Sequence, residues 1–179
     1  MHSFTIRHCL FNARLKVAGA LLGAALLLPA QAAAAPAAAP AVPSTFGVTI
    51  GPALLCVDHI DPFYFWSYMN QFFGPPYKRE GGAYWFKVQA TLWGATLTDV
   101  MVSDGENQQV FVAASFKASP AKLSIAIQNS TGFSHKAEMP FLYSPLVSAM
   151  GSKIVYFDQS SKIYCSKYNL DYNRRHLPR

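Results

Sequence analysis

The sequence predicts an α+β domain in which one or two helices pack on an antiparallel sheet held by one disulfide. Three observations predict this class. Two segments, beginning at Asp61-Pro62 and Ser119-Pro120, combine a helix start signal with helical spacing of apolar residues. Segments of alternating apolar and polar residues follow each of them. The order helix, strands, helix, strands suggests two related helix-plus-sheet units that share one core.

The N-terminus has the pattern of an export signal. Three basic residues and no acid precede an apolar run at 17–30, which is shorter than the roughly 20 residues of a membrane span. Small residues at positions 30 and 32 predict that residues 1–32 are a signal peptide cleaved after Ala32. An uncleaved anchor is the alternative. We therefore expect a periplasmic or secreted protein.

The rest of the chain predicts one domain between an N-terminal spacer and a C-terminal tail. Residues 33–43 contain only Ala, Val and Pro, which predicts an extended spacer. Residues 44–170 suit a single α+β domain, and residues 171–179 form a basic tail. Without the signal peptide, twelve basic residues stand against nine acidic ones, a formal net charge of +3. The basic tail could contact anionic lipid or nucleic acid, but a solvated tail is the simpler interpretation and export separates the protein from most nucleic acid. We therefore expect no nucleic-acid partner and at most peripheral membrane contact.

Two cysteines remain after the predicted cleavage, and in an oxidising compartment such a pair is normally bridged. We predict a Cys56–Cys165 disulfide that ties the entry of the first predicted helix to the last strand. One alternative makes Cys56 a nucleophile with His59 as its base. Another joins Cys56 to Asp58, His59 and Asp61 in a metal site. Both alternatives need a free thiolate at Cys56. Without it, Asp58, His59 and Asp61 could still hold a hard cation, but their spacing matches no known calcium or zinc loop. We therefore expect no metal and no cofactor.

The first predicted helix covers 62–73. Asp61 is its expected N-cap, and Gly74-Pro75 ends it. Its apolar side chains recur at helical spacing and predict a core stripe; they are Phe65, Trp66, Met69, Phe72 and Phe73. The charged, glycine-containing segment 76–82 predicts an exposed loop able to bind.

The segment 83–93 alternates as a strand does. Its even-numbered residues are apolar, and its odd-numbered residues mix polar side chains with Trp85 and Trp93. This second side predicts a solvated face that also binds a partner. Segments 95–103 and 108–117 flank a Gly-containing turn and predict a hairpin.

The second half is less regular. Residues 121–128 fit either a helix or a strand, and the Ser119-Pro120 start favours the helix. Two prolines in 133–152 predict loops and short edge pairing, and His135 is expected to be a surface or locally bonded residue. The segments 153–157 and 162–167 predict a closing hairpin.

No motif of a known catalytic class is present. The sequence lacks a Gly-x-Ser-x-Gly elbow, a phosphate-binding glycine loop, a His-Glu-x-x-His pair and a dinucleotide fingerprint. Acid and base groups can still meet in space, and His59 with Asp58 or Asp61 is the best such candidate. The small stock of histidines and acids favours a non-catalytic protein, so we assign no catalytic residue and no role to His59.

Composition favours protein binding. The chain contains three Trp and nine Tyr, side chains that dominate protein interfaces. We expect it to recognise another envelope or secreted protein as an inhibitor, immunity factor or assembly accessory. Exported inhibitors and small outer-membrane assembly proteins include two-unit domains of similar outline, an analogy at the level of the fold only. The predicted binding residues are Tyr77, Lys78, Arg79, Trp85 and Trp93.

The alternative function is a carrier or sensor of a small apolar ligand. That ligand would lie between helix and sheet, with Phe65, Trp66 and Met69 in the wall of its cavity. A carrier would need an internal apolar cavity of roughly 300 Å³ or more. A protein-binding domain would instead leave Trp85, Trp93 or the 76–82 segment exposed.

Overall fold

The structure is a computed structural model of the 179-residue chain, and it describes residues 41–157, 160–169 and 172. The predicted signal peptide at 1–32, nearly all of the spacer at 33–43 and most of the tail at 171–179 lie outside the described residues. Those assignments stay predictions.

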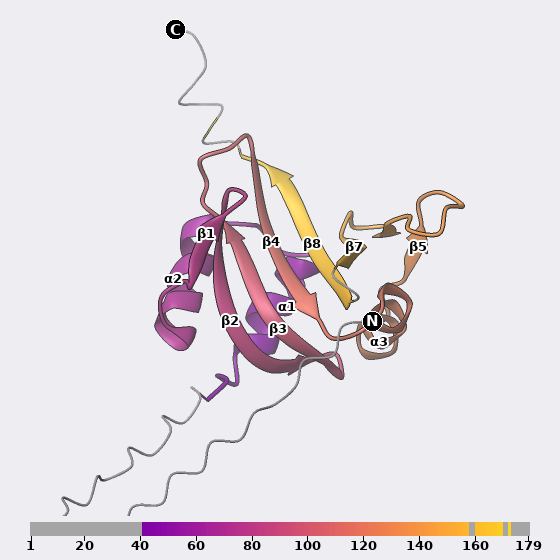
Figure 1. Cartoon of the computed structure of the whole chain (residues 1–179), viewed down its shortest axis with the longest axis horizontal. Helices are drawn as coiled ribbons and strands as arrows, with labels where there is room; N and C mark the ends of the chain where they lie inside the picture. Colours follow the sequence, from indigo (N-terminus) through magenta and orange to yellow (C-terminus); the bar gives the residue numbers. More distant parts are fainter. Residues whose placement is uncertain (1–40, 158–159, 170–171, 173–179) are drawn as a thin grey trace, which may run out of the picture. The chain divides into compact units, whose positions relative to one another are not determined.

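Three helices pack on one eight-stranded antiparallel sheet, which confirms the predicted α+β class (Figure 1). The helices are α1 Phe46–Leu54, α2 Pro62–Phe73 and α3 Pro120–Thr131. The strands are β1 Lys78–Glu80, β2 Ala83–Leu92, β3 Ala95–Ser103, β4 Gln109–Phe116, β5 His135–Ala137, β6 Leu146–Ser148, β7 Lys153–Phe157 and β8 Ser160–Tyr168.

The strand order divides the sheet into two similar halves. The order is β1-β2-β3-β4-β8-β7-β6-β5, so each run of four consecutive strands proceeds from one edge to the centre. The two runs meet where β4 pairs with β8, with Val112 opposite Cys165. A helix precedes each run, α2 the first and α3 the second. This topology agrees with two related helix-plus-sheet units.

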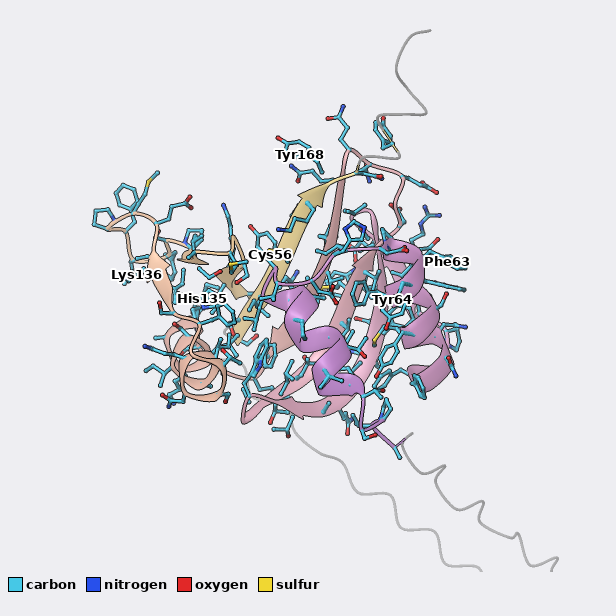
Figure 2. The ribbon with its side chains drawn as sticks, turned by 180° about the vertical axis from the view of Figure 1, so that it is seen from behind. Cys56, Phe63, Tyr64, His135, Lys136 and Tyr168 are labelled. Carbon is cyan, nitrogen blue, oxygen red and sulfur yellow. A yellow bond between two sulfur atoms is a disulfide. The ribbon has the colours of Figure 1, made fainter. Side chains whose placement is uncertain are left out.

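Helix α1 was not predicted from the sequence. Its N-cap, Thr45, makes no side-chain capping hydrogen bond, and Pro52 lies inside the helix. The sequence therefore shows no capping signal for the start of this helix, and the internal proline argues against a helix here. The helix forms because Phe46, Ile50 and Leu54 are buried in the core beneath the sheet. Figure 2 shows α1 and α2 lying on the same face of the sheet.

Helix α2 begins and ends where the sequence predicts. The Asp61 carboxylate accepts hydrogen bonds from the backbone N–H groups of Phe63 and Tyr64, at 2.9 and 3.2 Å. Gly74, with φ of 80°, follows the last helical residue. Phe65 and Met69 are 1% and 0% exposed against the sheet, so this part of the predicted core stripe is confirmed.

Helix α3 resolves the ambiguity at 121–128 in favour of a helix. The Ser119 hydroxyl accepts a hydrogen bond from the backbone N–H of Lys122, and Gly132 ends the helix in the left-handed conformation. Leu123 and Ile127 are buried in the same core as α1 and α2.

The segment 76–82 contains an edge strand where the sequence predicted a loop. Residues 78–80 pair with β2, with Lys78 opposite Trp85. The two-residue turn is formed by Gly81 and Gly82, which both have positive φ. Such a turn matches the twist of paired strands, so two glycines promote a hairpin here rather than a mobile loop.

The predicted disulfide between Cys56 and Cys165 is present. Both residues are buried, and the bond joins the connection between α1 and α2 to strand β8, at a sequence separation of 109. It therefore links the helical layer to the strand that joins the two halves of the sheet.

Candidate functional site on the open face of the sheet

The two faces of the sheet differ in what covers them. Helices pack on one face, and the opposite face, here called the open face, is turned toward the viewer in Figure 1. Strand pairing places Trp85, Met101, Ala113 and Tyr164 side by side across four strands of the open face. Met101 and Ala113 are buried, and the rings of Trp85, Phe111 and Tyr164 pack against them. The open face therefore has an aromatic centre of its own.

A depression of about 550 Å³ lies over this centre. We call it the aromatic hollow. Its lining combines aromatic and apolar groups with a few charged ones at the rim, contributed by β1, β2, β3, β4, β7 and β8. The residues are Lys78, Glu80, Gly81, Ala83, Trp85, Met101, Gln109, Phe111, Ala113, Phe157, Lys162, Tyr164 and Ser166.

Lysines surround the ring of Trp85. The Nζ atom of Lys78 lies 3.9 Å from the centre of that ring, and the Nζ atom of Lys162 lies 5.0 Å from it. Both distances are in the range of a cation–π interaction. The indole N–H of Trp85 donates a hydrogen bond to the backbone carbonyl of Glu80, at 3.1 Å, which fixes the ring. Trp85 is thus a half-buried, oriented aromatic group.

Asp99 is the buried carboxylate of the open face. It accepts hydrogen bonds from the Lys87 ammonium at 2.8 Å and the Tyr77 hydroxyl at 3.0 Å. Burial raises the pKa of Asp99, but hydrogen bonds, first that from Lys87, outweigh burial and hold this pKa below its usual value. Burial and the contact with Asp99 raise the pKa of Tyr77, so Tyr77 stays a hydrogen-bond donor.

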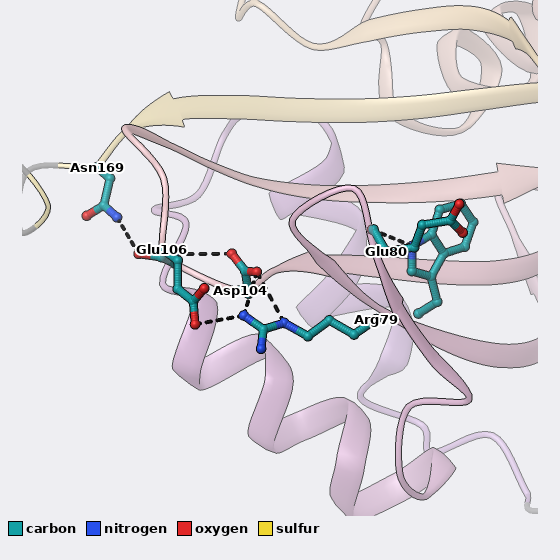
Figure 3. A network of polar contacts seen from close by, with 7 residues as sticks. Arg79, Glu80, Asp104, Glu106 and Asn169 are labelled. Carbon is teal, nitrogen blue, oxygen red and sulfur yellow. Dashed lines mark hydrogen bonds and ion pairs between the residues drawn. The ribbon is translucent and has the colours of Figure 1, made fainter.

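Tyr77, Lys78 and Trp85 are brought together beside the aromatic hollow, whereas Arg79 and Trp93 lie elsewhere. Arg79 forms ion pairs with Asp104 and Glu106, at 2.9 and 2.7 Å (Figure 3). It points away from the open face because neighbouring residues of a strand alternate sides. These contacts anchor the β3–β4 loop.

Trp93 does not share the side of Trp85, contrary to the alternation predicted for 83–93. It lies in the turn between β2 and β3 with φ of 54°. There its ring stacks on Phe116, with ring centres 6.0 Å apart, and packs against the core on the helix-covered face. The turn ends the strand before Trp93, so the strand period no longer determines its side.

An exposed apolar loop between β5 and β6 was missed as a candidate surface. Four large side chains within residues 139–143 are exposed, and Leu142 is 89% exposed. The loop is closed by hydrogen bonds from the Glu138 N–H to the Pro145 carbonyl and from the Met139 N–H to the Ser144 hydroxyl. The run Met-Pro-Phe-Leu-Tyr inside a predicted loop was the available signal. Such exposed apolar patches are typical of interaction sites.

The cluster that begins at Cys56 is structural in two of its positions. Cys56 is in the disulfide, so the thiolate that the nucleophile and metal hypotheses need is absent. Asp61 caps α2, and His59 is exposed. Within the described ranges, no group of three or more His, Cys, Asp or Glu side chains is placed to hold a metal ion.

His135 is buried rather than on the surface. Its Nε2 atom lies 2.7 Å from the Ser152 hydroxyl, which in turn contacts the Ser148 hydroxyl at 2.9 Å. Its Nδ1 atom is buried and has no hydrogen-bond partner among the residues described. The histidine therefore ties the start of β5 to the β6–β7 turn, as a local bonding role requires.

Acidification is expected to destabilise the protein through His135. Burial lowers the pKa of His135 below its ordinary value of 6.5, so the unfolded chain binds a proton at a higher pH than the folded one. The contribution of His135 to the free energy of unfolding is fully present above about pH 6.5. As the pH falls from there toward the lower pKa of the folded state, the free energy of unfolding decreases by about 1.4 kcal/mol per pH unit. Chemical denaturation from pH 7.5 to 5 should show a flatter pH slope for His135→Gln. The exposed control His59→Gln should keep the wild-type slope, and an unchanged slope in His135→Gln would contradict the assignment.

No protein-family model, curated protein or solved structure matches this chain. None of the helices in the described part of the chain is long and apolar enough to cross a membrane. The fold and its two faces are therefore the basis for any functional assignment.

Proposed function

We propose that this is an exported, non-catalytic binding protein that recognises another envelope or secreted protein with the open face of its sheet. The type of recognition is that of an inhibitor, an immunity factor or an assembly accessory. One observation carries the proposal: the open face presents an aromatic centre with charged groups at its rim, while the other face is covered by helices. Aromatic anchors surrounded by polar groups are the usual composition of protein interfaces.

Export is part of the proposal. The Cys56–Cys165 disulfide is compatible with an oxidising compartment such as the periplasm or the exterior of the cell. The predicted signal peptide would deliver the chain there. An intact mass that begins at residue 33 in protein purified from the export compartment would support this step. A mass that retains residues 1–32 would argue for an anchored protein.

Photo-crosslinking tests which face binds. A photoreactive amino acid at Gln109, in the lining of the aromatic hollow, should form an adduct with one partner protein in the producing cells. The same group at Val48, which is exposed on α1, is the control and should form none. Equal adducts from both positions, or no protein adduct from position 109, would overturn the proposal.

Trp85→Ala is expected to weaken binding of the partner identified in this way by roughly thirtyfold or more, because an oriented interface tryptophan contributes about 2 kcal/mol or more. Calorimetry with the purified pair measures the loss. Trp93→Phe is the matched control, since Trp93 packs on the helix-covered face. We expect its partner affinity to equal that of the wild type.

The alternative, a carrier of a small apolar ligand between helix and sheet, remains a prediction. Of its intended wall, Phe65 and Met69 are buried in the core. Trp66 instead lines an open depression of about 680 Å³ beside the β3–β4 loop, where acidic residues such as Asp104 and Glu106 make the lining unlike an apolar carrier cavity.

A further inference from the structure

Lys162 is the unpaired charge of the aromatic hollow. It is half-buried, and its Nζ atom lies 3.9 Å from the centre of the Phe157 ring and 5.0 Å from that of Trp85. No ion pair is formed by Lys162 within the described parts of the chain. Among the described residues, this ammonium group thus rests on aromatic rings and has no carboxylate within ion-pair distance.

The other charged groups nearby have partners. Lys78 pairs with Glu80 at 2.7 Å, and Lys87 pairs with Asp99 at 2.8 Å. The charged residues that line the hollow are Lys78, Glu80 and Lys162, so its lining carries one excess positive charge. Burial, and then the proximity of Lys78, lower the pKa of Lys162; the attraction of the Asp99 carboxylate opposes both without reversing the shift. Burial in the hollow therefore makes the charged form of Lys162 less favourable as long as no anion pairs with it.

We infer that the aromatic hollow receives an Asp or Glu side chain, flanked by apolar side chains, from a loop of the partner protein. The inference rests on the proposed function and specifies the chemistry of the partner. The carboxylate would pair with Lys162, and the flanking apolar groups would cover Trp85 and Phe111. Charge complementarity selects the acid, because a carboxylate supplies the one counter-charge that the lining lacks.

A protein loop fits this site better than a free small ligand. Small-ligand pockets enclose most of the ligand's surface. The hollow instead lies open on the sheet face, and Tyr77 beside it is a further contact group. A loop can place one carboxylate in the hollow and spread its apolar neighbours over that face.

The test uses head-to-tail cyclised peptides as loop mimics, because cyclisation reduces the entropic cost of binding. Three peptides share a Phe-x-Leu core in which x is Glu, Gln or Lys. The purified protein is titrated with each peptide and followed by two-dimensional NMR. We expect the Glu peptide to change the NMR chemical shift of the Trp85 indole N–H. It should bind roughly tenfold to a hundredfold more tightly than the Gln peptide. The Lys peptide should bind most weakly.

Lys162→Met should abolish the preference for Glu over Gln while keeping an apolar stem of similar length. The matched control is Lys167→Met, an exposed lysine of the same strand whose replacement changes the net charge equally. It should keep the wild-type preference. Thermal unfolding verifies that both variants fold, and we expect Lys162→Met to melt no lower than the wild type.

Three results would overturn the inference. The first is equal binding of the Glu and Gln peptides, including no binding of either at about 1 mM. The second is a Glu preference that survives in Lys162→Met. The third is tighter binding of decanoate than of the Glu peptide in the same hollow, which would identify a small carboxylate as the occupant. If any of these occurs while Trp85→Ala still weakens the crosslinked partner, the inference fails and the proposed function stands.

Discussion

Replacing both Cys56 and Cys165 by Ala is expected to lower the free energy of unfolding by about 2–5 kcal/mol. The bond closes a loop over a sequence separation of 109, and such long loops restrict the unfolded chain most. The bond is also buried, so each Ala leaves apolar space between the helical layer and β8. Denaturant titration measures the change, with the slope fitted separately for each protein because the cross-link makes the unfolded chain more compact.

The wild-type protein unfolded in the presence of a reductant is the control for this double variant. Reduction should remove most of the difference in the free energy of unfolding between the wild type and the double variant. Only the cavities left by the two Ala residues then distinguish the proteins. A loss below about 1 kcal/mol in the double variant would contradict a structural role for the disulfide. The double variant is preferred to either single one because it leaves no reactive thiol in the domain.

Phe65→Ala is expected to lower the free energy of unfolding by about 3–5 kcal/mol. Phe65 is 1% exposed and lies in the core between α2 and the sheet. Removing its ring leaves a cavity that the close-packed core around it cannot fill. Thermal and denaturant unfolding of the variant measure the loss.

Phe63→Ala is the matched control on the same helix. Phe63 is 75% exposed, and Figure 2 shows it on the outer side of α2. The same chemical change should alter stability by less than about 0.5 kcal/mol, the usual range for surface substitutions. Similar losses in the two variants would contradict the assignment of the buried face of α2.

Helix ends were predictable where the signal lies within a few residues. Asp61 and Ser119 both accept hydrogen bonds from the first turn of their helices. Capping depends on a side chain and the backbone immediately after it, so sequence alone reveals it. Helix α1 lacks such a cap and was missed, because burial against distant strands stabilises it.

The candidate site was predictable only in part. Of the five residues predicted to bind a partner, Tyr77, Lys78 and Trp85 do lie side by side, since they are close in the sequence where β1 pairs with β2. Their binding role stays a prediction. Lys162, Tyr164 and Phe157, which complete the aromatic hollow, come from the other half of the sheet. Their place beside Trp85 depends on the pairing of β4 with β8, which no local pattern specifies.

Local sequence signals were enough to predict the α+β class, the disulfide pair, the caps of α2 and α3 and the main strands of the first half. Each of these follows from signals within one segment or, for the disulfide, from the two cysteines that remain after the predicted cleavage. Four features depend on the tertiary fold instead: the order of the eight strands, the burial of His135, the side taken by Trp93 and, among the described residues, the lack of an ion pair at Lys162. These features arise from contacts between residues far apart in the chain, where packing overrides local preference.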